Sequence, residues 1–226
     1  MRVATYAPAT TGSSDADGSA NREARPSDSF VLTQSLITSR SNVSPKRLVD
    51  PGPTPSQLEA LFELAAAAPD HGQLTPWRFV VIAPEQRHLL AEVFALALID
   101  RDPGATLDQI EDAREKAHRA PVLIAAVACL GRREPDIPLL ERMVSVGAAI
   151  QNMLLGAYAM GYGGGLTSGQ AMASPRMQKL LSLEQGESAV CCVNLGTPVK
   201  TKKPTRMRPL PGSFVRTLLP LEGVPQ

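Results

Sequence analysis

The chain has 226 residues, 43% of them hydrophobic and 4% aromatic, and its formal net charge is +1. This length and composition suffice for the core of one sizeable domain. The near-zero charge argues against a dedicated nucleic-acid surface, and the scarcity of aromatic residues argues against recognition of stacked bases.

No apolar run reaches the roughly 20 residues of a membrane-spanning helix, and the N-terminus lacks the apolar core of a signal peptide. The three cysteines, Cys129, Cys191 and Cys192, lie in apolar runs without metal-ligand spacing, so we expect buried, reduced thiols. We therefore expect a cytoplasmic protein without a metal site.

Residues 1–29 are rich in Ser, Thr, Asp, Gly and Ala and contain almost no large apolar side chains. Because burial does not offset the ordering of such a segment, we expect a tail followed by one domain over 30–226. Apolar residues at helical spacing, with capping signals such as Thr54 before Pro55, predict these helices: 30–39, 55–68, 84–98, 107–119, 139–160 and 175–181.

Three apolar runs predict strands, over 77–83, 121–130 and 188–195. The last two runs are apolar enough to be central strands that are buried on both faces. Helices that outnumber the strands and alternate with them indicate an α+β or α/β layered domain.

The predicted helix 139–160 has apolar or small residues on nearly all sides. A helix without a polar face is buried, and a chain this small has limited interior of its own. We therefore expect an obligate dimer that buries more than ~2,000 Å²; the alternative is a monomer with one central helix. The glycines over 161–165 follow this helix rather than a strand, so they predict a helix stop and not a dinucleotide-binding fingerprint.

Residues 68–79, Ala-Pro-Asp-His-Gly-Gln-Leu-Thr-Pro-Trp-Arg-Phe, connect a predicted helix to a predicted strand. A proline at each end of the polar stretch restricts the backbone. Such a loop holds polar groups at a fixed place, which suits a ligand better than a core.

Two basic segments are candidates for binding a phosphate. Ser39-Arg40-Ser41 places two hydroxyls beside a guanidinium, and the run from Lys200 to Arg208 directly follows a buried strand. In that run Arg206 and Arg208 are the better candidates, because arginine holds a phosphate through two donors. A solvated surface is the alternative for both segments.

Hydrolytic and metal catalysis have little support. His71 lies beside Asp70 and has the chemistry of a base, but no Ser or Cys has a recognisable nucleophile setting such as Gly-x-Ser-x-Gly. No His, Cys or carboxylate cluster has the spacing of metal ligands. We therefore assign no catalytic residue and no metal ligand.

The order of these pieces resembles the nitroreductase family of FMN-dependent oxidoreductases, and in particular a short, single-domain branch of it. The resemblance covers about residues 30–218 and rests on the triplet at 39–41, the 68–79 loop, Arg119-Ala120-Pro121, Gln151-Asn152 and the ending Leu195-Gly196-Thr197-Pro198. It implies an α+β, three-layer α/β/α domain with a mainly antiparallel sheet, and a homodimer with FMN at the subunit interface.

The resemblance also implies site residues. Ser39, Arg40 and Ser41 match the family's triplet at the flavin phosphate and ribityl chain, although Ser39 replaces the usual arginine; Arg208 or Arg206 would supply the missing charge. The cofactor residues implied elsewhere fall in two segments, the loop that reaches the partner's flavin and the segment along the isoalloxazine ring: Pro69, Asp70, His71 and Gln73 in the first, and Leu166, Thr167 and Ser168 in the second.

The implied chemistry belongs to the flavin. NADH or NADPH would deliver hydride to FMN, and a nitroaromatic, a quinone or a similar electron-poor acceptor would then take the electrons in a ping-pong mechanism. The alternatives are a flavin-dependent dehydrogenase of the same superfamily and a non-catalytic flavin-binding protein. Neither nucleic acid nor a membrane is an expected partner.

Overall fold

A computed structural model of the chain describes residues 3–5, 27–132, 135–199 and 207–218. The chain divides into two compact units, Pro26–Lys200 and a second unit from Met1–Arg25 and Thr201–Gln226. In the second unit, β1 (Val3–Thr5) pairs antiparallel with β7 (Arg216–Leu218). The expected tail at 1–29 thus includes a short strand and the first residues of a helix that begins at Asp28; the rest of that expectation stays a prediction.

The larger unit contains the six predicted helices: α1 (Asp28–Ser39), α2 (Pro55–Ala66), α3 (Arg87–Arg101), α4 (Leu107–Glu115), α5 (Leu139–Ala159) and α6 (Pro175–Leu180). Its strands are β2 (Leu48–Val49), β3 (Trp77–Val81), β4 (Val122–Cys129), β5 (Gly163–Thr167) and β6 (Glu187–Pro198). The strands β2 and β5 were not predicted, because two residues in a Pro-rich connector and a run of glycines carry little β-propensity.

Several boundaries differ from the predictions. A 3₁₀ turn at Pro84–Gln86 comes before α3, which therefore begins at Arg87 and continues to Arg101. The helix expected over 107–119 ends as an α-helix at Glu115, and Lys116–His118 forms a 3₁₀ turn. Short 3₁₀ turns at helix ends are common because they satisfy backbone groups that the helix leaves open.

Capping side chains define several helix starts. The Thr54 hydroxyl accepts a hydrogen bond from the backbone N–H of Gln57 at 3.3 Å, and Gln57 Oε1 accepts one from the backbone N–H of Thr54 at 2.9 Å. The Ser174 hydroxyl likewise accepts the backbone N–H of Met177 at 3.1 Å. The cap at Thr54 was predicted, and each cap satisfies donors that the first turn of a helix leaves unpaired.

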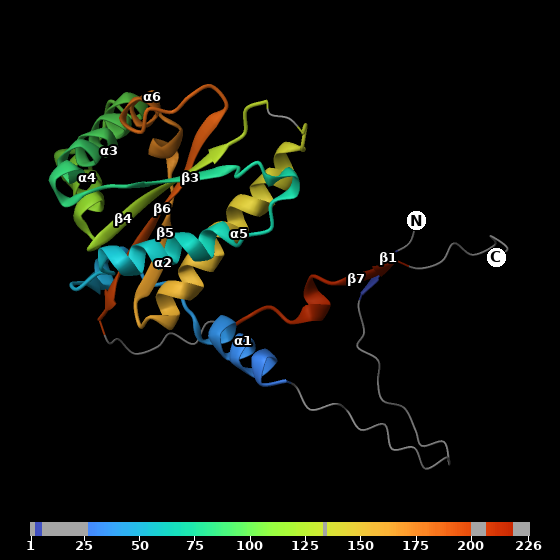
Figure 1. The fold of residues 1–226 in the computed structure, drawn as a ribbon. Coiled ribbons are helices and arrows are strands. Elements are labelled where there is room, and N and C mark those ends of the chain that lie inside the picture. Colours follow the sequence, from blue (N-terminus) through green and yellow to red (C-terminus); the bar gives the residue numbers. More distant parts are fainter. Residues whose placement is uncertain (1–2, 6–26, 133–134, 200–206, 219–226) are drawn as a thin grey trace, which may run out of the picture. The chain divides into compact units, whose positions relative to one another are not determined.

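The sheet of the larger unit is antiparallel throughout. β6 pairs with β4, β5 and β2, and β3 pairs with β4 (Figure 1). The two strands that the sequence places at the centre are therefore neighbours, and every residue of β4 after Val122 is buried.

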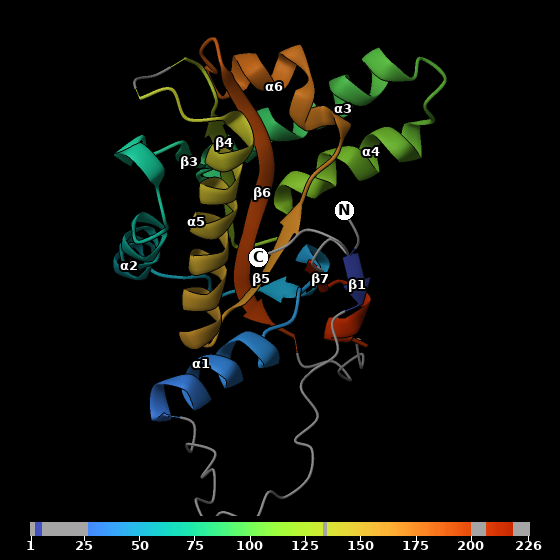
Figure 2. The ribbon, with the colours of Figure 1, turned by 90° about the vertical axis from the view of Figure 1, so that its right-hand side faces the viewer.

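Helices cover both faces of this sheet (Figure 2). Alternate residues of β4 point to opposite sides: Ile124 and Ala126 pack with α2 and α5, whereas Leu123 and Val127 pack in the core beneath α3 and α6. The three-layer α/β/α arrangement with an antiparallel sheet confirms the expected α+β fold.

Helix α5 is not buried on all sides within one chain. Its inner face carries Ala149, Met153 and Ala157, which are fully buried, but Leu140 and Val144 are 83% and 70% exposed. The apolar pattern therefore describes two faces, of which this chain covers one. Among the described residues, no helix combines the length and apolarity needed to cross a bilayer.

Candidate functional site

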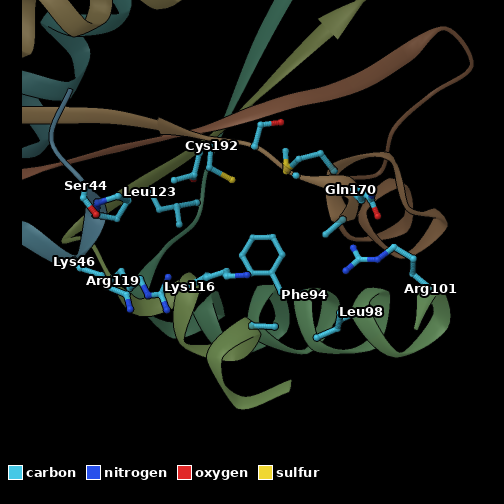
Figure 3. A pocket seen from close by; sticks show the side chains of 17 residues that line it. Ser44, Lys46, Phe94, Leu98, Arg101, Lys116, Arg119, Leu123, Gln170 and Cys192 are labelled. Atoms are coloured by element: carbon cyan, nitrogen blue, oxygen red, sulfur yellow. The ribbon is translucent and has the colours of Figure 1, made fainter. Parts of the chain in front are cut away.

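A cavity of about 390 Å³ lies between the sheet and the helices α3 and α4 (Figure 3). Its apolar lining includes Phe94 and Leu98 on the wall formed by α3 and Leu123 on the wall formed by the sheet. The other lining residues come from β6, from the chain before β2, from the end of β5 and the chain after it, and from α3, α4 and the connection after α4: Cys192, Ser44, Pro45, Lys46, Thr167, Ser168, Gly169, Gln170, Ala171, Met172, Arg101, Ala113, Lys116 and Arg119. Planar apolar ligands fit cavities of this size and composition.

All the charged side chains among the described residues that line the cavity are basic. Lys46, Lys116 and Arg119 lie toward one end and Arg101 toward the other, with the Phe94 ring between them (Figure 3), and no carboxylate lines the cavity. Arg119 also makes long contacts with acidic groups outside it, of which the shorter joins Nη2 to Glu115 Oε2 at 3.8 Å. The donor set therefore suits an anionic ligand with a flat apolar part.

Arg87 holds the segment that carries Lys116 and Arg119. This arginine is buried, and its guanidinium donates to the carbonyl oxygens of Ile82 at 2.9 Å and, across the fold, of Ala117 at 2.7 Å. It also donates to the carbonyls of Ala120 and Pro121, at 3.1 and 3.0 Å. Burial lowers the pKa of Arg87, but four carbonyl partners compensate much of the desolvation.

The cavity thiol is not a nucleophile. Burial raises the pKa of Cys192 to about 12, and burial raises that of Cys191, on the opposite face of β6, to about 11. A thiol with such a pKa stays protonated at neutral pH, and the thiolate is the reactive form. All three cysteines are buried free thiols, as the sequence predicted.

Two of the site residues expected on β5 and after it line this cavity. Thr167 Oγ1 accepts a hydrogen bond from the buried Asn194 amide at 2.9 Å, and Ser168 Oγ donates to the backbone carbonyl of Val190 at 3.0 Å. Leu166 comes just before them and is 42% exposed; its backbone N–H donates to Asn42 Oδ1 at 3.3 Å. With both hydroxyls held in this way, the segment has a defined position beside the cavity.

The residues after α1 run alongside β5. Arg40 and Ser41 line a smaller cavity of about 150 Å³ together with Gly163 and Gly164, whereas Ser39 ends α1 and is exposed. Farther along, Ser44 and Lys46 line the larger cavity, so one short segment joins the two.

Position 165 has no room for a side chain, because another backbone segment passes against it. A Cβ at Gly165 would lie 2.2 Å from the backbone oxygen of Val43, and the backbone N–H of Val43 donates to the carbonyl of Gly164 at 2.9 Å. The backbone that passes close to this glycine is therefore the segment after Ser41.

The loop at Pro69–Gln73 lies elsewhere. His71–Gln73 forms a 3₁₀ turn that contacts the start of α5, and none of the described residues that line either cavity belongs to this loop. Arg208 is described only within the unit of the chain ends, and Arg206 lies outside the described residues. Neither arginine is therefore placed against a cavity.

Sequence reasoning missed several residues that line the larger cavity: Lys46, Phe94, Arg101 and Lys116. A signal existed for Lys116, which lies three positions before Arg119 on one face of the predicted helix 107–119. Lys46 and Phe94 have no local signal, because they lie on different elements that only the folded sheet brings together.

Solved structures share this fold. A nitroreductase-like protein from Bacillus cereus has a TM-score of 0.69 at 20% identity, covering 84% of this chain and 96% of that one. A variant of the FMN and NADPH-dependent nitroreductase NfnB from Sphigopyxis sp. strain HMH has a TM-score of 0.58 at 17% identity, covering 73% and 87%. The architecture is therefore that of nitroreductase-like proteins.

The sequence is similar to the same group. The "Putative NAD(P)H nitroreductase YdjA" of Escherichia coli strain K12 is 32% identical over 180 residues, which are 80% of this chain and 96% of that protein. The sequence pattern of the nitroreductase family matches residues 42–197. This chain belongs to the nitroreductase family, a family of oxidoreductases, which confirms the resemblance seen in the sequence.

Proposed function

We propose that this protein is an FMN-dependent oxidoreductase that takes hydride from NADH or NADPH and reduces nitroaromatics, quinones or similar electron-poor acceptors in a ping-pong mechanism. Family membership supports the general activity. The names of YdjA and NfnB support NAD(P)H as the hydride donor, and that of NfnB also supports FMN. The proposal includes a cytoplasmic location for the protein, which its three free thiols support.

The observation that carries the proposal is the basic, carboxylate-free cavity beside Thr167 and Ser168. FMN combines a flat aromatic ring with a phosphate, and the described residues fit both parts: apolar side chains for the ring and cationic side chains for negative charge. When bound, FMN would supply the hydride chemistry, accepting from the nicotinamide and donating to the acceptor.

The chain's own residues would bind and tune the cofactor. Phe94, Leu98 and Leu123 would exclude water from the ring, and Lys46, Lys116 and Arg119 would favour negative charge at their end of the cavity. Arg40 and Ser41, joined to Lys46 by the segment beside β5, would hold the anionic end. Ser39, Arg206 and Arg208 stay assigned to the phosphate region as predictions.

A homodimer belongs to the same proposal. The loop at Pro69–Gln73 lies outside both cavities of its own chain, so in a dimer it is available to the partner's flavin. The outward face of α5, with Leu140 and Val144, and the exposed apolar residues of α1 supply the surface such a dimer would bury.

The test is an absorbance spectrum of the purified protein, followed by anaerobic mixing with NADH or NADPH. We expect a flavin spectrum that bleaches with the nicotinamide and returns when a nitroaromatic or quinone is added. Substrate-driven reduction without NAD(P)H would identify a dehydrogenase, and flavin that NAD(P)H leaves oxidised would identify a carrier. A colourless protein that takes up no added FMN would contradict the proposal.

Lys116→Met tests the cavity itself. Loss of one cation that faces an anionic ligand should weaken FMN binding by about tenfold, measured by fluorescence titration. Lys179→Met removes an exposed lysine of α6 that does not line the cavity and serves as the matched control. Equal FMN affinity in the two variants would place the flavin elsewhere.

A further inference from the structure

The loop Asp70–Thr75 has an unusual backbone. Gly72, Gln73 and Thr75 have φ angles of +76°, +53° and +45°, all in the left-handed region. Residues with a side chain adopt this region rarely, and strained backbone of this kind persists only where surrounding contacts hold it. Such strain is concentrated at ligand-binding and active sites, so we expect this loop to have a role in binding.

Two contacts fix the loop backbone. Asp70 Oδ2 accepts a hydrogen bond from the backbone N–H of Thr75 at 2.7 Å, which closes the loop on itself. Gly72 packs against the segment before α5, where an added Cβ would lie 2.7 Å from Pro135 Cγ and 3.3 Å from Ile137 Cγ1. These two contacts hold the loop backbone, and neither of them involves the His71 side chain.

A third contact holds only that side chain. His71 Nδ1 lies 2.5 Å from Oε1 of Glu141, in the first turn of α5. The pair is solvent-accessible, with 66% of the His71 side chain and 45% of the Glu141 side chain exposed, and exposed ion pairs contribute little to stability. Its effect is therefore to orient the imidazole rather than to hold the fold.

We propose that Glu141 is a positioning residue that fixes the His71 ring with Nδ1 toward α5 and Nε2 toward the flavin of the partner subunit. Because a carboxylate only accepts hydrogen bonds, Nδ1 carries the hydrogen, and Nε2 is the ring nitrogen left for a ligand. The N-terminal end of α5 favours a negative charge at Glu141. The inference rests on the proposed function, which supplies the flavin and the dimer.

The first test reads the ring itself, in protein stripped of flavin. Long-range ¹H–¹⁵N spectra at alkaline pH distinguish the two neutral tautomers of the three histidines. We expect the Nδ1–H tautomer for His71 in the unaltered protein and a shift toward Nε2–H in Glu141→Ala. His88, whose Nδ1 lies 2.7 Å from the backbone oxygen of Glu85, is the internal reference and should not change. An unchanged His71 spectrum would overturn the proposal.

The second test is a double-mutant cycle on FMN affinity. Glu141→Ala should weaken FMN binding by about tenfold without lowering the melting temperature, and it should have no further effect in a His71→Ala background. Glu92→Ala is the matched control, because Glu92 also makes an exposed ion pair from a helix, at 2.7 Å to Arg114 Nε. It should leave FMN affinity unchanged.

The outcomes separate this inference from the proposed function. Additive effects of the two substitutions, or unchanged FMN affinity in Glu141→Ala, would overturn the positioning role while leaving the flavoprotein intact. If the unaltered protein takes up no FMN, the proposed function fails and this inference fails with it.

Discussion

Glu187, at the start of β6, ties together separate parts of the chain. Its carboxylate accepts hydrogen bonds from Arg78 Nε at 2.8 Å and Nη2 at 2.7 Å, from the backbone N–H of Glu184 at 3.0 Å and from the Cys129 thiol at 3.4 Å. The Arg78 hydrogen bonds are the main cause that lowers the pKa of Glu187 to about 2. The Glu187 side chain is 12% exposed and the Arg78 side chain 35%, so solvent screens the pair only in part.

We predict a pH-dependent stability from this pair. A carboxylate whose pKa falls from 4.5 to about 2 on folding stabilises the protein above pH 4.5, and this stabilisation is lost as the pH falls through 2. Glu187→Gln should lower the free energy of unfolding by about 2 kcal/mol at neutral pH. Urea unfolding should show the gap to the unaltered protein closing in acid. Glu92→Gln, at an exposed pair, should change stability much less, and a gap independent of pH would refute the assignment.

At the scale of elements, two buried arginines connect helix starts to the loops before them. Arg87 Nε donates to the carbonyl of Ile82, and Arg142 Nε donates to that of Ile137, each at 2.9 Å and each five residues back in the chain. Arg87 also reaches the connection between α4 and β4, which carries Lys116 and Arg119. The start of α3 and one wall of the cavity are therefore held by one side chain.

Arg87→Met should destabilise the protein by about 3 kcal/mol, because four carbonyl oxygens lose their donor in a buried place. Chemical denaturation measures the change. Arg114→Met, which removes an arginine from exposed pairs on α4, is the control and should cost less than about 1 kcal/mol. Similar losses in both variants would show that the carbonyls of Arg87 find other partners.

At the scale of the whole molecule, one face of α5 is buried within the chain and the opposite face is exposed. Leu140, Val144 and Gly147 follow one another at helical spacing on its outward face, and all three are exposed. An apolar stripe on a long helix indicates an interface when it adjoins other exposed apolar residues. In the proposed homodimer, the same helix would carry Glu141 and so connect the interface to the His71 loop.

Val144→Glu should convert the proposed dimer to a monomer, because a carboxylate buried without a partner opposes association. Light scattering measures the mass, and FMN titration should show weaker uptake by the monomer. Leu107→Glu changes an equally apolar but unrelated residue, 83% exposed at the start of α4, and should stay dimeric. A dimeric Val144→Glu, or a monomeric unaltered protein, would contradict the assignment.

Much of the fold could be predicted because its signals are local. Helix caps such as Thr54, the apolar run at 121–130 and the left-handed Gly161 depend on neighbours in sequence. The loop at 68–79 and the triplet at 39–41 indicated the family because they, too, are short motifs of neighbouring residues. Boundaries moved where 3₁₀ turns, at Pro84–Gln86 and Lys116–His118, interrupted the expected helices.

The sequence by itself determined the six helices, the buried central strands and the family, because hydrophobic period and turn chemistry act within a few residues. The tertiary structure alone decided that Lys46, Phe94 and Lys116 share one cavity, that Val43 passes against Gly165, and that His71 meets Glu141. These contacts join residues separated by tens of positions, and only the order of strands in the sheet brings them together.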